Sequence, residues 1–343
     1  MSGIEFKQFV RSQYTPIPLP GHDFAQQTII ITGGNRGLGL EAARHFLRLN
    51  AAKIILAMRD VGQGHDCIAS MKKSCPSSEG VVEIWELDLT NVETIRQFVA
   101  RAMRLPRLDA VILNAGMATM SFQTVDGMER TLATNVTGTF LLAIGLLPAL
   151  RLSALQFNVR PRIVLVSSQG HQSAVFTERT ADDIFGALND ASKADMADRY
   201  DTTKLVQLLA FYALQDTVNR SWSGSIIFRT VDPGLCDTGL TREMPLLIRI
   251  IHRIMKMLLA RTPEVGGRCI VLGAANFDKG DYDGGYVKDG VVESPPDAVT
   301  GPEAAKLKER VFSQLLSLLR RMDPQIMDSG PPMELDQEET RVA

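Results

Sequence analysis

The chain has 343 residues, of which 45% are hydrophobic and 22% are charged, and its formal net charge is −2. This length can bury a large core, and the balanced charge, which contains no basic block, excludes a general affinity for nucleic acid. The four scattered cysteines and five histidines form neither a disulfide framework nor a metal-binding pattern, so we expect no metal site and a reducing compartment, the cytoplasm.

Residues 1–25 are mixed in character and contain prolines, and we interpret them as an arm packed on the surface. The first twenty residues lack the apolar stretch of a secretory signal, so we expect none. No run of about 18 uncharged apolar residues predicts a transmembrane span. We therefore expect a soluble intracellular protein.

Short apolar segments then alternate with helical patterns. The apolar segments are rich in Val, Ile and Leu without polar alternation, which is typical of strands buried on both faces. We predict strands over Thr28–Thr32, Lys53–Met58, Val81–Leu87, Leu108–Leu113, Arg162–Val166 and Ser225–Val231, and helices over Gly39–Leu49, Asn91–Arg104 (with Thr90 as N-cap), Gly127–Leu150 and Tyr200–Val218. Repeated βα units predict an α/β fold: a Rossmann-type, doubly wound parallel sheet in three layers, forming a single domain over residues 26–323.

Other segments extend this unit. Residues 172–198 are polar and acidic, and residues 244–260 form an apolar stretch with three basic side chains. Near the C-terminus, apolar residues recur at helical spacing from Leu307 to Met322. Residues 324–343 contain prolines, glycine and acids, and we expect a disordered tail there.

The segment TIIITGGNRGLGLEAARHF, Thr28–Phe46, places glycines directly between the first strand and the first helix. Glycines permit a tight turn and let the backbone approach a ligand closely. The helix start adds free N–H groups and the positive end of its dipole. Within a βαβ unit, this arrangement predicts a pyrophosphate-binding loop for a dinucleotide.

The spacing Gly33-x-x-x-Gly37-x-Gly39, together with Thr32, resembles that of the short-chain dehydrogenase/reductase family. Further marks of this family follow in order over roughly residues 26–290. They are Asp88 in LDLT, Asn114, Ala115 and Gly116 in LNAG, Asn135 in TNVTG, Ser168 in VLVSS, Tyr200 and Lys204 in YDTTK, and Pro233 and Gly234 in VDPGL. The resemblance implies a nicotinamide dinucleotide bound along these segments, with Asn35, Arg36 and Leu38 in the glycine loop.

The end of the second strand indicates which dinucleotide is bound. An acid at this place would accept hydrogen bonds from the ribose hydroxyls of NAD. Here the strand ends in Ala57–Met58–Arg59–Asp60, so the usual acidic position is apolar and Arg59 follows. Arg59 and Arg36 can clamp a 2′-phosphate, which favours NADP (NADPH). The alternative is that Arg59 is a solvated charge and Asp60 binds the ribose. The resemblance implies that Asp88 contacts the adenine.

Tyr200 and Lys204 lie four residues apart on a predicted helix and so share one face. Hydride transfer to a carbonyl leaves negative charge on oxygen, which needs a proton donor. A nearby ammonium favours the phenolate and lowers the pKa of a tyrosine. By resemblance, Lys204 also binds the nicotinamide ribose, Ser168 bonds the substrate oxygen, and Asn135 holds Lys204 through a water. We prefer Ser168 to Ser167 because the family's serine is the second of such a pair.

Tyr200 lies 32 positions after Ser168, more than in many members of the family. Longer gaps resemble the branch of retinol dehydrogenases and WW-domain oxidoreductases, as do AMRD at Ala57–Asp60 and TPEVGG at Thr262–Gly267. We predict that the added residues, 172–198, form a polar flap near the pocket mouth. Soluble members with a short N-terminal arm also resemble fungal reductases of secondary metabolism.

In this family, residues 240–261 would cover the substrate. Met244–Ala260 is apolar with Arg249, Arg253 and Lys256 roughly on one helical face. We expect a lid first and peripheral membrane contact second. The expected substrate is a small molecule, an apolar ketone, aldehyde or secondary alcohol. We interpret the Cys236 thiol as inert packing. Members of the family also form homodimers through the helices predicted at 127–150 and 200–218.

Two classes of function fit these residues. The first is an NADP-dependent oxidoreductase, a ketoreductase of a secondary-metabolite pathway or, alternatively, a retinol or lipid dehydrogenase. The second is a non-catalytic, NADP-binding regulatory or scaffold protein. The set Ser168, Tyr200, Lys204 and Asn135 favours the enzyme, since a scaffold has no need of it.

Overall fold

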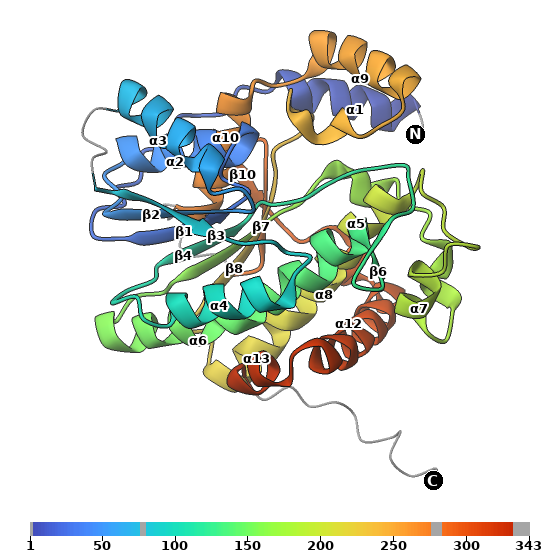
Figure 1. Ribbon diagram of the computed structural model, residues 1–343. Coiled ribbons are helices and arrows are strands. Elements are labelled where there is room, and N and C mark those ends of the chain that lie inside the picture. Colours follow the sequence, from blue (N-terminus) through green and yellow to red (C-terminus); the bar gives the residue numbers. More distant parts are fainter. Residues whose placement is uncertain (1–2, 76–79, 276–282, 332–343) are drawn as a thin grey trace.

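A central eight-stranded sheet organises the protein in a computed structural model that describes residues 3–75, 80–275 and 283–331 (Figure 1). Its strand order is β10-β9-β8-β7-β4-β1-β2-β3, and all neighbours run parallel except β9 and β10. The strands are β1 Thr28–Thr32, β2 Lys53–Met58, β3 Val82–Glu86, β4 Ala110–Leu113, β7 Arg162–Val166, β8 Ile227–Asp232, β9 Gly285–Lys288 and β10 Val291–Glu293. All six predicted strands are present, and β9 and β10 extend the sheet beyond them.

Helices cover both faces of the sheet, which confirms the three-layer Rossmann-type α/β fold (Figure 1). One face carries α2 (Gly37–Arg48), α3 (Gly62–Ser74) and α10 (Pro263–Ala274), and the other carries α4 (Val92–Ala102), α6 (Thr139–Phe157) and α8 (Arg199–Trp222). In β1, Ile30 packs into one core and Ile29 and Ile31 into the other. Burial on both faces explains why the strand sequences do not alternate.

The segment predicted as a helix over Gly127–Leu150 begins differently. Gly127 is in a turn with φ of +80°, and Met128–Glu129 is strand β6, which pairs with β5 (Thr124–Val125). The helix then runs through α5 (Arg130–Leu132), the π-helical η2 (Ala133–Gly138) and α6. By length and composition Arg130–Phe157 could cross a membrane, but 67% of its most apolar window is buried, as in the core helix of a folded domain.

The C-terminal region differs from the disordered tail predicted over residues 324–343, because its first part is helical. After α11 (Asp297–Thr300) and α12 (Pro302–Met322), residues Pro324–Ser329 form helix α13, which the buried carboxylate of Asp323 caps. Ile326 and Met327 of α13 are buried. The burial of these two apolar side chains stabilises the helix although the sequence around them is polar. Residues 332–343 of the predicted tail lie outside the described residues. Helices α12 and α13 pack on α8 and α6, the helices expected at a dimer interface.

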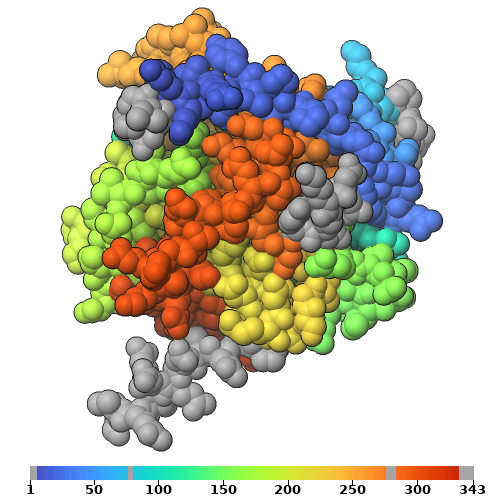
Figure 2. Space-filling model, turned by 180° about the vertical axis from the view of Figure 1, so that it is seen from behind, coloured from blue at the N-terminus to red at the C-terminus, as the bar shows by residue number. Residues whose placement is uncertain are grey.

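The N-terminal arm is partly a helix, α1 (Gly3–Tyr14), which lies beside α9 (Leu246–Leu259) at one end of the molecule (Figures 1 and 2). The hydroxyl of Tyr14 donates to the carbonyl of Leu258 over 2.8 Å. Thr262 caps the next helix, α10, and Pro263 occupies its first turn, as the sequence predicts. The helix α4 is capped by Asn91, however, not by Thr90.

The insertion 172–198 exposes many polar side chains and is anchored to the body of the protein by apolar ones. It continues from η3 (Gln169–Gln172) into η4 (Thr177–Thr180) and α7 (Ile184–Leu188). Its apolar side chains Phe176, Ile184, Phe185 and Leu188 are buried in the same hydrophobic core as those of α8. Gln314 and Arg310 of α12 bond its backbone. Its acids are prominent in the sequence, but these apolar anchors decide where it lies.

Candidate active site

A cavity of about 760 Å³ opens at the carboxyl ends of β1, β2, β4, β7 and β8. In a doubly wound sheet this edge is where ligands bind. The predicted site residues that line the cavity are Thr32, Gly33, Asn35, Arg36, Gly37, Leu38, Arg59, Asp88, Asn114, Ala115, Gly116, Ser168, Tyr200, Lys204, Pro233 and Gly234. Gly39 and Asn135 do not line the cavity, but each contacts residues that do.

The glycine loop leaves room for a pyrophosphate because two of its residues cannot carry side chains. Gly33 has φ of +66°, and a Cβ there would lie 3.1 Å from the Cα of Ala115. A Cβ on Gly39 would lie 2.7 Å from the Nδ2 of Asn114. The loop therefore packs tightly on the segment after β4 and directs the start of α2 toward the cavity. This cradle fits a dinucleotide phosphate group.

Thr32 and Asn114 line the cavity, but their polar atoms join two loops to each other. The Thr32 hydroxyl accepts hydrogen bonds from the backbone N–H of Asn114 (3.0 Å) and of Ala115 (2.9 Å). The Asn114 amide donates to the carbonyl of Thr32 over 2.8 Å. These contacts hold the ends of β1 and β4 together, so both residues shape the cavity wall.

Around the predicted 2′-phosphate site, Arg36 and Arg59 are exposed and line the cavity. The Asp60 carboxylate instead accepts from the backbone N–H of Gly62 (3.0 Å) and from the Gln63 amide (2.8 Å). Asp60 therefore serves the start of α3, which reduces its capacity to accept from a ribose. Asp88 similarly accepts from the backbone N–H and the hydroxyl of Thr90, at 2.9 and 2.8 Å, while lining the cavity.

Ser168 and Tyr200 meet at the inner end of the cavity. Their side chains hydrogen-bond to each other, and the Ser168 hydroxyl also accepts from the backbone N–H of Gly170 over 3.2 Å. Ser167 has its backbone bonded to Val231 and its side chain buried. The 32-residue gap in sequence thus closes in space, and the contact assigns Ser168 as the serine beside the phenol.

Lys204 lies one turn from Tyr200 on α8, and its Nζ is 5.9 Å from the centre of the phenol ring. The ammonium is buried and donates to the carbonyl of Val166 over 2.9 Å. Burial lowers the pKa of Lys204 to about 8, while the carboxylate of Asp232 acts in the opposite direction. Asp232, at the end of β8, was not predicted from the sequence, since an acid after a strand is common.

The pKa of Tyr200 departs from the prediction. Burial raises the pKa of the phenol above its ordinary value, and the hydrogen bond from Ser168 only partly opposes this. The expected lowering by Lys204 is therefore not the dominant effect in this geometry, because loss of hydration disfavours the phenolate more. A phenol of this kind keeps its proton at neutral pH.

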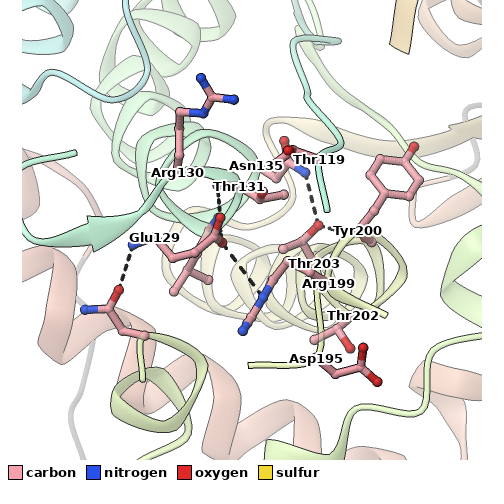
Figure 3. Close-up of polar contacts among 12 residues, drawn as sticks. Thr119, Glu129, Arg130, Thr131, Asn135, Asp195, Arg199, Tyr200, Thr202 and Thr203 are labelled. Atoms are coloured by element: carbon pink, nitrogen blue, oxygen red, sulfur yellow. Dashed lines mark hydrogen bonds and ion pairs between the residues drawn. The ribbon is translucent and has the colours of Figure 1, made fainter. Parts of the chain in front are cut away.

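Asn135 lies in the π-helical turn η2 and is fully buried. Its amide donates to the hydroxyl of Thr203 over 3.0 Å (Figure 3). The amide also donates to the carbonyl of Met117, and its Oδ1 accepts from the Met117 N–H, both over 2.9 Å. Asn135 and Lys204 flank Gly116, where a Cβ would lie 3.5 Å from Oδ1 and 3.9 Å from Nζ. The predicted water between Asn135 and Lys204 stays a prediction.

Arg199, directly before Tyr200, is a residue that the sequence reasoning missed. It is buried 3.8 Å from the buried Glu129 (Figure 3). The buried Glu178 lies 3.7 Å from it on another side. Glu129 caps α5, which leads to Asn135, and Glu178 belongs to the insertion 172–198. The guanidinium thus joins both segments to the start of α8. A single arginine in a polar sequence carries no signal of this burial.

The arm α1 also reaches the site. Its Gln13 donates to the carbonyls of Leu235 (2.9 Å) and Leu259 (2.8 Å) and accepts from the N–H of Leu235 (3.0 Å). Phe9 lines the cavity. The arm therefore fixes the turn after Pro233 and Gly234 to the end of α9, which goes beyond the surface packing that we predicted.

Residues 240–261 form one wall of the cavity, as the lid prediction requires. Leu240, His252, Met255 and Lys256 line it, together with the ion pair of Arg130 and Glu243 at the rim. Burial raises the pKa of the Cys236 thiol to about 12, so this cysteine is unreactive at neutral pH.

Comparisons with known proteins identify the family of the chain. The sequence profile of the short chain dehydrogenase family matches residues 27–178. Short chain dehydrogenase FGM9 of Gibberella zeae is 73% identical over 342 residues, which is 100% of both chains. Short chain dehydrogenase atnD of Emericella nidulans is 45% identical over 284 residues, 82% of this chain and 90% of its own.

Solved structures share the fold. A protein from Mycobacterium paratuberculosis has a TM-score of 0.63 at 23% identity, with 92% of this chain and 97% of its own covered. A short-chain dehydrogenase from Sphingobium yanoikuyae, solved in complex with NADPH, has a TM-score of 0.52 at 22% identity over 72% of this chain and 83% of its own. At such identities the likeness concerns the fold alone.

The Arg199 cluster predicts a large loss of stability in Arg199→Met. This variant leaves Glu129 and Glu178 buried without their cation, which costs about 3–5 kcal/mol. Urea unfolding measures the free energy of unfolding. The control is Lys308→Met, which breaks the more exposed pair with Asp216 and should cost about 0–1 kcal/mol. Equal losses in the two variants would contradict the buried ion-pair assignment.

Proposed function

The chain belongs to the short-chain dehydrogenase/reductase family, and from that premise we propose that it is an NADP(H)-dependent oxidoreductase. It transfers a hydride between the nicotinamide and the carbonyl or secondary alcohol group of an apolar small molecule. The observation that carries this proposal is the contact of the Ser168 and Tyr200 hydroxyls beside the Lys204 ammonium, at the inner end of the glycine-loop cavity.

The bound nicotinamide supplies the hydride, and the side chains of the chain handle the proton. The Tyr200 phenol donates its proton to the carbonyl oxygen as negative charge develops there. Ser168 donates a hydrogen bond to the same oxygen or to the phenolate. The Lys204 ammonium, fixed by the Val166 carbonyl at 2.9 Å, stabilises the negative charge left on Tyr200. Because burial raises the pKa of the phenol, Tyr200 holds its proton at neutral pH, which is the form that can donate to a carbonyl oxygen.

The preference for NADP rests on Arg36 and Arg59. Both guanidiniums line the cavity, while Asp60 is engaged by Gly62 and Gln63. Two guanidiniums can bind the dianionic 2′-phosphate, which NAD lacks. The Sphingobium yanoikuyae structure contains NADPH, so this fold accepts that cofactor. At 22% identity, the argument for the cofactor preference of this chain rests on its own residues.

The substrate side favours an apolar molecule. Phe9, Met117, Leu240 and Met255 contribute apolar walls, and Arg130, Glu243 and Asp201 contribute polar groups that can orient it. Flexible methionine side chains adapt to irregular apolar shapes. Retinol or another lipid alcohol is the alternative substrate within this class.

As the biological setting we propose a ketoreductase step of a fungal secondary-metabolite pathway in the cytoplasm. The organisms of the two relatives, Gibberella zeae and Emericella nidulans, are fungi, and both proteins align over most of their lengths. A homodimer is expected from the family resemblance. The covering of α6 and α8 by α13 and α12 restricts such an interface to the parts of residues 127–150 and 200–218 that these helices leave exposed.

Removal of the phenol hydroxyl should strongly reduce the turnover of carbonyl substrates. Tyr200→Phe should lower kcat by about 100-fold or more, because the proton donor is lost, while NADPH binding remains. The assay follows NADPH absorbance with a panel of aliphatic and aromatic ketones and aldehydes. Tyr212→Phe is the matched control, since it removes a buried hydroxyl of the same helix that bonds Thr230. Unchanged turnover in Tyr200→Phe would contradict the assignment of Tyr200 as the proton donor, whereas a wild type without turnover on the whole panel would favour the scaffold alternative.

Removal of Arg59 should shift the cofactor preference toward NAD. Arg59→Ala should weaken NADPH binding by about 10-fold and leave NADH binding within about twofold, because only the 2′-phosphate contact is lost. The ratio of kcat/KM for NADPH and NADH measures the preference. Arg104→Ala, another exposed arginine, is the control. A preference for NADH in the wild-type enzyme would overturn the cofactor assignment.

The reaction should also depend on the protonation of Lys204. Carbonyl reduction needs the ammonium, so kcat/KM should fall as pH rises through about 8, where burial places the pKa of Lys204. Lys204→Arg should move this alkaline decline to higher pH, since a guanidinium keeps its charge. The measurement is kcat/KM for the carbonyl substrate from pH 6 to about 10. A profile of the same shape in both enzymes would contradict this role.

A further inference from the structure

The outer face of α9 is an extended apolar surface. Seven large side chains on this helix are between 46% and 76% exposed, and no residue of the helix is buried. They are Leu246, Leu247, Ile250, Ile251, Ile254, Met257 and Leu258. Their spacing of one, three and four residues places them on one continuous face. Exposed apolar surface of this extent usually marks a site of interaction.

The opposite face of α9 is already occupied by the body of the protein. His252 and Lys256 line the cavity, and the Lys256 ammonium is 3.6 Å from Asp237. At the end of the helix, Tyr14 and Gln13 of α1 bond the carbonyls of Leu258 and Leu259. The inner side of α9 is therefore a cavity wall, and the seven apolar side chains form the outer side of the same wall.

The charged residues of the segment that carries this face are all basic. From Met244 to Pro263 the chain contains arginines and a lysine but neither Asp nor Glu. Arg249 and Arg253 are exposed, and the helical spacing places both beside Leu246 and Met257 at the edge of the apolar face. Lys7 and Arg11 of the neighbouring helix α1 are exposed as well. An apolar face with arginines at its margin is the pattern of a helix that lies in a membrane interface.

We propose that the outer face of α9 docks on a lipid bilayer with anionic headgroups. The seven apolar side chains enter the boundary between headgroups and acyl chains, and Arg249 and Arg253 pair with the headgroups. The cavity then opens next to the bilayer, where apolar substrates concentrate. This docking concerns where the protein binds and does not depend on turnover, so it stands or falls separately from the proposed reaction.

A second copy of this chain fits the surface less well. A symmetric pairing through α9 places the same patch of both copies in contact, and so brings Arg249 and Arg253 of one copy toward those of the other. Within residues 244–263 the partner offers no carboxylate to neutralise them. Anionic lipid satisfies the apolar face and the arginines together.

The experiment measures co-sedimentation of the full chain with vesicles. Phosphatidylcholine vesicles are compared with vesicles that contain phosphatidylserine, at low and high salt. The test variant is Leu247→Asp/Ile254→Asp, and the matched control is Leu152→Asp/Leu155→Asp on α6. The exposures match, since Leu247 and Ile254 are 68% and 53% exposed and Leu152 and Leu155 are 52% and 70% exposed. Thermal unfolding establishes that each variant is folded, and light scattering gives its oligomeric state.

We expect the wild type and the α6 variant to bind the anionic vesicles and the α9 variant to bind at least 10-fold more weakly. Arg249→Gln/Arg253→Gln should weaken binding by about 5-fold for each arginine removed, and high salt should do the same. A wild type that stays in the supernatant overturns the proposal. So does equal binding of the α6 and α9 variants. A dimer in solution that only the α9 variant dissociates, without vesicle binding, assigns the face to a second copy instead.

Discussion

The burial of one ammonium group constrains the arrangement of the whole site. A cation removed from water is costly unless hydrogen bonds and nearby opposite charge compensate for it. For Lys204 these are the carbonyl of Val166 at the end of β7 and the carboxylate of Asp232 at the end of β8. Both strand ends must therefore stay close to α8. Ser168 follows Val166 by two residues and Tyr200 precedes Lys204 by one turn, so the same contact positions both hydroxyls.

A second buried cation fixes α8 from another side. Arg199 and Lys204 are five residues apart, so they point in different directions around the helix. Lys204 is directed to the cavity, whereas Arg199 lies between Glu129 and Glu178. The insertion 172–198 is thereby attached to the first turn of α8 by charge and to the core by Phe176 and Ile184. The residues between Ser168 and Tyr200 thus brace the helix that carries Tyr200 and Lys204.

What could be predicted from the sequence follows from the range of the contacts involved. The βα alternation, the glycine loop and the Tyr200–Lys204 pair depend on neighbours within one or two turns, and the structure places them as predicted. The packing of α1 was not predictable in the same way, since Gln13 bonds Leu235 and Leu259 more than 200 residues away. The anchoring of the insertion was not predictable either, because acids dominate its sequence while a few apolar residues determine its position. Helix α13 was missed because two buried residues, Ile326 and Met327, hold it.

One face of α9 lines the cavity and its outer apolar face is exposed, and the two faces are physically linked. A helix of 14 residues that buries none of its side chains gains little from packing, and isolated helices of this length are marginal in water. Its order depends on contacts at its ends, from Arg130 to Glu243 and from Gln13 and Tyr14 to its last carbonyls. Anything that covers the outer face favours the helical form, and so does a molecule in the cavity that contacts Met255. By linkage, each of the two must then strengthen the binding of the other. A helix with one face on the cavity and an unburied apolar face on its outside can thus couple the filling of the cavity to the covering of that outer face.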